Sequence, residues 1–152
     1  MSNFRKDILE QAKAIRRKQD SILTEAVEIA QASTEEPSAT VGVLVDGIPA
    51  WEPGKTYEKA YTLFSYNGAV GFTRQANLTA QEIYPPFSVG TEALYGARPS
   101  PDENGVYSYI YNMAAKEGMR VKEDEDVYVC YQALDPMLYP PSQLAAHFTK
   151  EE

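Results

Sequence analysis

The chain has 152 residues, with 22 Asp and Glu against 14 Lys and Arg, a formal net charge of −8, one Cys and one His. This balance argues against a nucleic-acid partner, because binding to phosphate backbones needs clustered Lys and Arg. One Cys and one His exclude an internal disulfide and the ligand sets usual for zinc, so we expect no metal and no cofactor.

Composition divides the chain near residues 33–37. Residues 1–33 contain no Pro, Gly, Tyr or Trp, whereas all ten Pro, all nine Gly and all eleven Tyr follow residue 36. The sequence therefore predicts an N-terminal oligomerisation helix over 1–33, a linker and first strand over 34–50, a first β unit over 51–98, and a linker and second β unit over 99–152.

The first segment carries an apolar seam whose members are spaced alternately four and three residues apart: Ile8, Ala12, Ile15, Gln19, Ile22, Ala26 and Ile29. Such a heptad pattern is typical of a coiled coil. An apolar stripe must be covered, so two arrangements are open: a parallel homo-oligomer, or one amphipathic helix folded back on its own domain. Ile at every seventh residue favours self-association. Alternation with Ala and with the polar Gln19 fits neither the simplest dimer rule nor the simplest trimer rule.

No apolar run approaches the roughly 20 residues that a bilayer span requires, and the N-terminal sequence MSNFRKDILEQ is polar. We therefore expect synthesis in the cytoplasm and no membrane partner.

The rest of the chain is predicted to be β. Ala39–Val45 is a β-branched run closed by Asp46-Gly47, which predicts a strand and a turn. Tyr61–Tyr66 runs into Asn67-Gly68 and then Ala69–Thr73, which predicts a hairpin.

A further strand is expected at Val127–Tyr131, after the acidic run Glu123–Asp126. Acid pairs such as Glu123 with Glu125 could serve glycoside hydrolysis in a cleft, but acids on a turn are usually solvated. We therefore expect no enzymatic activity.

The chain also contains an approximate internal repeat. Val127, Val129 and Gln132 follow Val70, Phe72 and Gln75 by 57 residues, and Leu138–Pro141 follows Ile83–Pro86 by 55, each being aliphatic-Tyr-Pro-Pro. A duplication explains these matches; chance matching in a chain rich in Tyr and Pro is the alternative. The predicted fold class is α+β, an N-terminal coiled-coil helix followed by a β-rich domain made of two related small β units that share one core.

The segment Ala50–Tyr57, followed by Leu63–Gly68 and Gln75, resembles the small chitin-binding-type carbohydrate-binding modules of families 5 and 12. Similar segments occur in minor structural and fibre proteins of tailed phages, often behind an N-terminal helix like Phe4–Glu10. The resemblance implies a virion structural protein, a fibre or appendage of head or tail. It would be made in the host cytoplasm and bind other virion proteins, and it would be a homotrimer because such appendages are commonly trimeric.

The resemblance also implies a carbohydrate-binding receptor-recognition module as the alternative function, with host-surface glycans as ligands. Trp51, Tyr57 and Tyr66 are the candidate sugar-binding residues. The chain departs from the modules, however, since Ala69 and Val70 follow Gly68 where an aromatic is usual. Sugar rings dock on exposed aromatic faces, so this departure favours the structural function. We accordingly expect Trp51 to be mostly buried, and both Tyr-Pro-Pro segments to pack as rigid corners.

Overall fold

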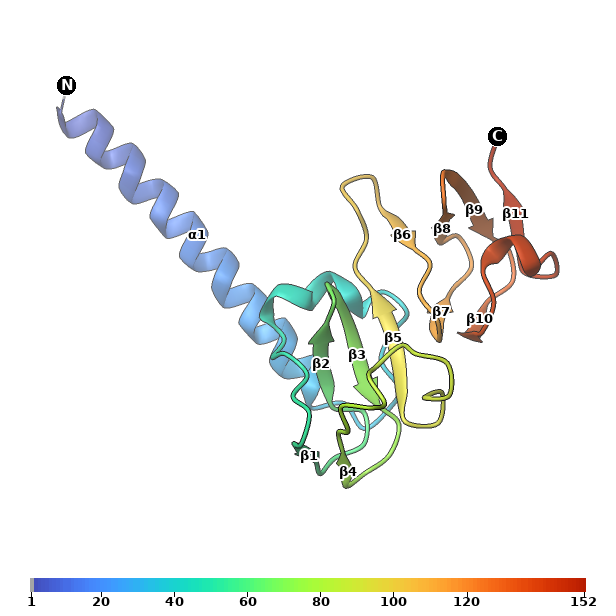
Figure 1. The fold of residues 1–152 in the computed structure, drawn as a ribbon. Coiled ribbons are helices and arrows are strands. Elements are labelled where there is room, and N and C mark those ends of the chain that lie inside the picture. Colours follow the sequence, from blue (N-terminus) through green and yellow to red (C-terminus); the bar gives the residue numbers. More distant parts are fainter. Residues whose placement is uncertain (1) are drawn as a thin grey trace.

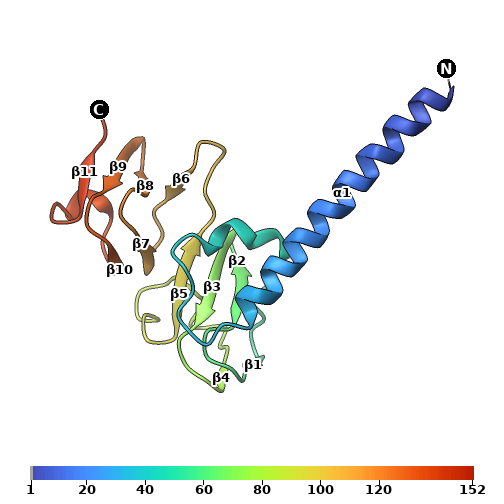
Figure 2. The same ribbon diagram turned by 180° about the vertical axis from the view of Figure 1, so that it is seen from behind.

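A long N-terminal helix projects from a β-rich head (Figure 1). The computed structural model describes residues 2–152, with side chains from Asp7 onward. Helix α1 spans Ser2–Gln31, which confirms the predicted helix; Met1 lies outside the described residues. The opposite view shows the same separation, with the first turns of α1 far from every strand (Figure 2). No helix in the described part of the chain is long and apolar enough to cross a membrane.

The head contains eleven short strands and two 3-10 helices among the described residues. In chain order they are η1 Val41–Gly47, β1 Thr56–Tyr57, β2 Leu63–Tyr66, β3 Ala69–Thr73, β4 Leu78–Thr79, β5 Tyr95–Pro99, β6 Val106–Ser108, β7 Met113–Ala115, β8 Arg120–Glu123, β9 Asp126–Cys130, β10 Leu134–Met137, η2 Pro141–Gln143 and β11 Phe148–Lys150. The fold is therefore α+β, as predicted.

Three sheets make up the head. One has five strands in the order β10-β7-β5-β3-β2, a second has four in the order β11-β9-β8-β6, and β1 pairs with β4 alone. Strands β7 and β10 come from the second half of the chain, yet they extend the sheet of the first half. The predicted hairpin is confirmed as β2 and β3, and the predicted strand after the acidic run is confirmed as β9.

The prediction of a strand at Ala39–Val45 is wrong, because Val41–Gly47 forms the 3-10 helix η1. Gly42 packs so closely on the backbone of β5 that an added Cβ would lie 2.0 Å from the carbonyl oxygen of Pro99. Leu44 and Val45 pack against the same buried cluster as Val27 of α1, while Val43 faces solvent. The apolar side chains of η1 therefore lie at helical spacing and pack toward α1, and this packing overrides their preference for a strand.

The two β hairpins share one register. Leu63 pairs with Phe72 and Tyr66 with Ala69 in β2–β3, while Arg120 pairs with Val129 and Glu123 with Asp126 in β8–β9. Each residue of the second hairpin stands 57 positions after its counterpart, which is the offset found in the sequence.

The same correspondence continues into the next strand of each sheet. Thr73 pairs with Tyr95 on β5, and Cys130 pairs with Phe148 on β11. The turns entering these strands also match. The amides of Tyr95 and Phe148 donate to the carbonyl oxygens of Thr91 and Leu144, at 3.0 and 2.9 Å. The orders β2-β3-β5 and β8-β9-β11 are therefore alike in pairing and direction.

The two aliphatic-Tyr-Pro-Pro segments have matching burial. Their second prolines, Pro86 and Pro141, are buried, whereas Tyr84 and Tyr139 are exposed. The expectation of packed corners therefore holds for the prolines and is wrong for the tyrosines. Fixed proline backbones place these rings at the surface instead of in the core.

The described residues form two apolar clusters. One, around Phe72 and Val70, includes η1 and the last turns of α1. The other joins Ala97 of the first half to Met113, Val121 and Phe148 of the second half. The halves are therefore packed together, as each would be too small to bury a sufficient core alone.

Candidate functional site

The predicted seam of α1 lies uncovered on this chain. Its isoleucines expose 49% (Ile8), 59% (Ile15), 57% (Ile22) and 68% (Ile29) of their surface. Ala12 and Gln19 are exposed as well, and Ala26 is half-buried. Four large apolar side chains in one row facing water make this the most extended apolar surface among the described residues of the helix.

A different face of α1 holds the head. Val27 and Ala30 pack against the buried cluster around Val70 and Phe72, and an added Cβ on Gly47 would lie 2.9 Å from Val27. The helix therefore does not fold back to cover its seam, since only its last turns contact the head and they use other residues. This arrangement disfavours the second of the two sequence-based alternatives.

The end of the helix is fixed to the sheet edge by Gln31. Its Nε2 donates to the carbonyl oxygen of Leu63 at 3.1 Å, and its Oε1 accepts from the Leu63 amide at 3.0 Å. Lys59 Nζ donates to the Gln31 carbonyl oxygen at 2.7 Å. Since β2 is the edge strand of its sheet, the Gln31 side chain satisfies backbone groups that would otherwise lack a strand partner.

Two of the three candidate sugar-binding residues come together. Trp51 and Tyr66 are both half-buried, with ring centroids 5.5 Å apart in an edge-to-face contact. They border an open hollow of about 360 Å³, whose lining is Val45, Asp46, Ala50, Trp51, Ser65, Tyr66, Asn67 and Gly68. Trp51 Nε1 donates to the Tyr95 hydroxyl at 3.2 Å, which fixes the indole ring. Trp51 is thus less enclosed than the sequence led us to expect.

Tyr57 does not belong to this hollow. It is only 4% exposed, its ring packs near Phe64, and its hydroxyl accepts a hydrogen bond from the Glu52 amide at 3.2 Å. Burial, the main cause, raises the pKa of Tyr57. Its assignment as a sugar-binding residue is corrected on this ground, because a ring enclosed by the core has no face to offer a ligand.

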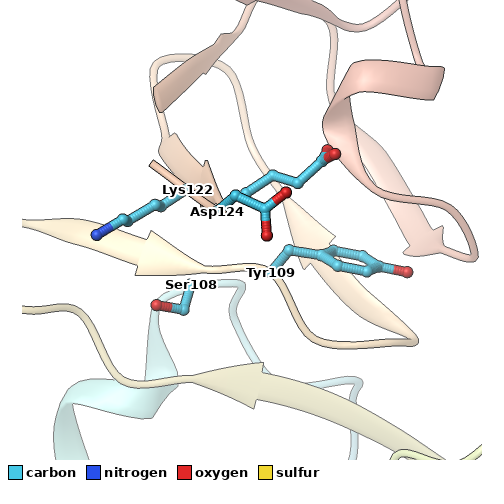
Figure 3. A pocket seen from close by; sticks show the side chains of 5 residues that line it. Ser108, Tyr109, Lys122 and Asp124 are labelled. Carbon is cyan, nitrogen blue, oxygen red and sulfur yellow. The ribbon is translucent and has the colours of Figure 1, made fainter. Parts of the chain in front are cut away.

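A second open hollow, of about 390 Å³, lies on the other sheet (Figure 3). Its lining is Ser108, Tyr109, Lys122, Glu123 and Asp124. The Glu123 carboxylate is held by the Ser142 amide at 3.0 Å and the Ser142 hydroxyl at 2.8 Å. Burial and, secondly, the nearby Glu123 charge raise the pKa of Tyr109. Sequence reasoning missed this hollow.

A cluster of four charged side chains joins distant segments. Arg98, 1% exposed, contacts Glu36 at 3.2 Å and Asp135 at 3.3 Å, and its guanidinium lies 4.6 Å from the Phe72 ring centroid. Arg74 contacts the same Glu36 oxygen at 3.0 Å. Burial, then the hydrogen bond with Glu36, raises the pKa of Asp135 to about 6. The cluster thus connects the segment after α1 to both halves of the head.

The chain matches no protein-family model and no curated protein. Among the described residues, no group of three or more His, Cys, Asp or Glu side chains is placed to hold a metal ion. The uncovered seam and the two hollows are therefore the features from which a function can be argued.

Proposed function

We propose that the chain is a non-enzymatic structural protein that assembles through α1 and displays its β-rich head at the end of a helical stalk. The observation that carries this proposal is the row of exposed isoleucines on a helix whose other face already holds the head. From Asp7 onward, the residues of α1 that project beyond the head have no other surface in the described part of the chain to cover them (Figure 1).

The energetics support self-assembly. Each seam isoleucine exposes about half or more of its surface, so covering it contributes about 1–2 kcal/mol, or about 4–8 kcal/mol per chain. Most helical stability in proteins comes from packing of an amphipathic face. Partner helices would supply that packing where the head does not.

The proposed assembly is a parallel homotrimer. In the heptad, the isoleucines take the d positions and Ala12, Gln19 and Ala26 take the a positions, a pattern that matches neither the simplest dimer rule nor the simplest trimer rule. The choice of a trimer therefore rests on the resemblance to phage appendage proteins, which are commonly trimeric. On this proposal the protein is part of a virion, as a fibre or appendage of head or tail, with the helix as its anchor and the head facing outward.

We propose further that the head arose by duplication of a small β unit. The shared register of β2–β3 and β8–β9, and the matched pairings of β5 and β11, support it. Chance matches of Tyr and Pro would leave strand pairing unrelated.

Charge substitution on the seam tests the assembly. Ile15→Asp with Ile22→Asp would place two carboxylates per chain inside the coil, and burying an unpaired charge is strongly unfavourable. Light scattering of the full chain should then give the monomer mass. The matched control is Ala14→Asp with Ser21→Asp, which adds the same charges at the same spacing one residue off the seam and should leave the assembly intact. Equal masses for the two variants would contradict the proposal.

Point variants are preferable to removing residues 1–33. Deletion would remove Gln31 from the edge of β2 and Val27 and Ala30 from the core around Phe72. A change of mass after such a deletion would not separate lost assembly from a damaged head.

A second candidate function is carbohydrate binding, and the hollow between Trp51 and Tyr66 favours it. Aromatic rings beside a few polar groups in an open depression are typical of small-molecule sites. Asp46 and Asn67, both exposed, supply the polar groups. A glycan array probed with the full chain tests this function; binding that is lost in Trp51→Ala would support it, and no binding by the unmodified chain would refute it.

A further inference from the structure

The two hollows of the head occupy equivalent places. The Trp51 amide donates to the carbonyl oxygen of Ser65 at 2.8 Å, and the Tyr109 amide donates to that of Lys122 at 3.0 Å. Ser65 and Lys122 are the counterparts in the shared hairpin register, 57 positions apart. Trp51 and Tyr109 therefore take the same position beside the first hairpin strand of each half.

The neighbouring backbone agrees with this equivalence. Ala50 forms a parallel bridge to Ser65, and Ser108 pairs in parallel with Lys122. An additional strand segment thus lies along the same edge of both hairpins. Trp51 and Tyr109 are 58 positions apart, whereas the matching hairpin residues are 57 apart. A sequence comparison at the single offset of 57 therefore does not align Trp51 with Tyr109.

The linings correspond residue by residue. In the order Ala50, Trp51, Ser65, Tyr66 and Asn67, the first hollow matches Ser108, Tyr109, Lys122, Glu123 and Asp124 of the second. The turn residues Asn67 and Asp124 have the same left-handed backbone, with φ of 50° and 54°. Equivalent backbone has therefore produced an open hollow with one aromatic wall in each half.

We infer that the Tyr109 hollow is a second binding site, equivalent to the Trp51 hollow, and that both take a neutral, hydroxyl-rich ligand such as an oligosaccharide. This inference rests on the second of the functions proposed above. It would give each chain two sites, and a trimer six.

The chemistry of the linings favours that ligand class. Each hollow combines an aromatic wall with hydrogen-bonding groups on an open surface, which suits a ring with an apolar face and polar edges. Each also contains at least one carboxylate, Asp46 in the first and Glu123 and Asp124 in the second, which disfavours anions. The second hollow replaces Tyr66 and Ser65 by Glu123 and Lys122, so it offers more hydrogen bonds and less aromatic surface.

The turn of the second hairpin, which borders the second hollow, is held in place before any ligand binds. Ser142, which follows the second Tyr-Pro-Pro segment, holds both oxygens of Glu123 through its amide and hydroxyl. A carboxylate already held by a neighbouring turn loses little freedom on binding, so it can orient a sugar hydroxyl at small entropic cost.

The test is a calorimetric titration of the full-length chain with chitotetraose and, separately, with cellotetraose. We expect two sites per chain for the probe that binds. Tyr109→Ala should reduce this to one site, and Trp51→Ala should remove the other. Lys122→Met changes an exposed residue at the rim of the second hollow and should weaken only the second site. This variant tests the second site even if Tyr109→Ala fails to fold. Tyr139→Ala, which removes an exposed ring that lines neither hollow, should leave two sites.

The possible outcomes distinguish a failure of the second site from a failure of carbohydrate binding itself. One site per chain, lost in Trp51→Ala and unchanged in Tyr109→Ala and Lys122→Met, would overturn the second site and leave carbohydrate binding standing. No binding of either probe by the unmodified chain would overturn both.

Discussion

The attachment of α1 to the head through Gln31 yields a quantitative prediction. On the open edge of β2, the backbone amide and carbonyl groups of Leu63 and Ser65 point away from β3. The Ser65 amide donates to the Pro49 carbonyl oxygen and the Ser65 carbonyl oxygen accepts from the Trp51 amide, both at 2.8 Å. Gln31 supplies both partners of Leu63, at 3.0 and 3.1 Å. Gln31→Met keeps the length of the side chain and removes both hydrogen bonds.

The expected destabilisation follows from these two contacts. Each hydrogen bond contributes about 0.5–1.5 kcal/mol net, and leaving a buried backbone group unsatisfied raises the penalty. Leu63 is 2% exposed, but it lies at a sheet edge that water can reach once the amide is gone. We therefore expect Gln31→Met to lower the free energy of unfolding by about 2–3 kcal/mol. Gln31→Glu should be at least as damaging, because a carboxylate oxygen would face the Leu63 carbonyl oxygen.

The assay is urea unfolding at fixed chain concentration, together with amide hydrogen exchange. The Leu63 amide should lose protection in Gln31→Met, while the amides in the middle of β3 keep theirs. Gln11→Met, on the exposed and projecting part of α1, is the matched control and should change stability by less than about 0.5 kcal/mol. Equal stability of the two variants, or an unchanged Leu63 exchange rate, would refute the reasoning.

Two further predictions concern the core and the charged cluster. Gly96→Ala should destabilise the head by about 3 kcal/mol in urea unfolding, because the added Cβ would lie 2.2 Å from the fully buried Phe72 ring; a loss below about 1 kcal/mol would contradict the packing. The pKa of Asp135 is about 6 in the native state, against 3.8 as the ordinary value, so the native state binds the proton of this carboxyl more tightly than the unfolded chain does. Protonated Asp135 therefore stabilises the native state fully below about pH 4, and this stabilisation is lost as the pH rises through about 6. Unfolding of Asp135→Asn from pH 4 to 7.5 should lack that decline, whereas the exposed control Asp126→Asn should retain it; a decline of equal size in Asp135→Asn would show that another group is responsible.

The sequence predicted the elements whose information is local. The seam from Ile8 to Ile29 predicts a long helix, and Asn67-Gly68 between two runs of mainly apolar and aromatic residues predicts a hairpin. These patterns depend on periodicity and turn chemistry, which the chain carries at short range.

Elements that depend on tertiary contacts could not be predicted in the same way. Val41–Val45 has the composition of a strand, but its conformation is decided by packing on α1 and on the backbone of Pro99. Nothing near Arg98 in the sequence indicates that it is buried, since its partners Glu36 and Asp135 lie 62 and 37 positions away.

Comparison of the chain with itself did not find the second hollow, for a related reason. Its five residues keep the backbone positions of the first hollow, but the side chain differs at every one of them, with Tyr109 for Trp51, Lys122 for Ser65 and Glu123 for Tyr66 among the changes. The one-residue slip before Tyr109 removes it from the 57-residue alignment. Backbone hydrogen bonds preserve the equivalence where side chains do not.

The central claim, that copies of this chain pack in parallel along the seam, is tested most directly by disulfide crosslinking. Cys130 is the one native cysteine and is buried, so a cysteine introduced on α1 is the accessible thiol. In a parallel, in-register coil Ala12 meets Ala12 of its neighbours, so Ala12→Cys should give covalent dimers on mild oxidation of the full chain, whereas Ala14→Cys, off the seam, should not. Monomers only from Ala12→Cys, or equal crosslinking of the two variants, would contradict assembly through this seam.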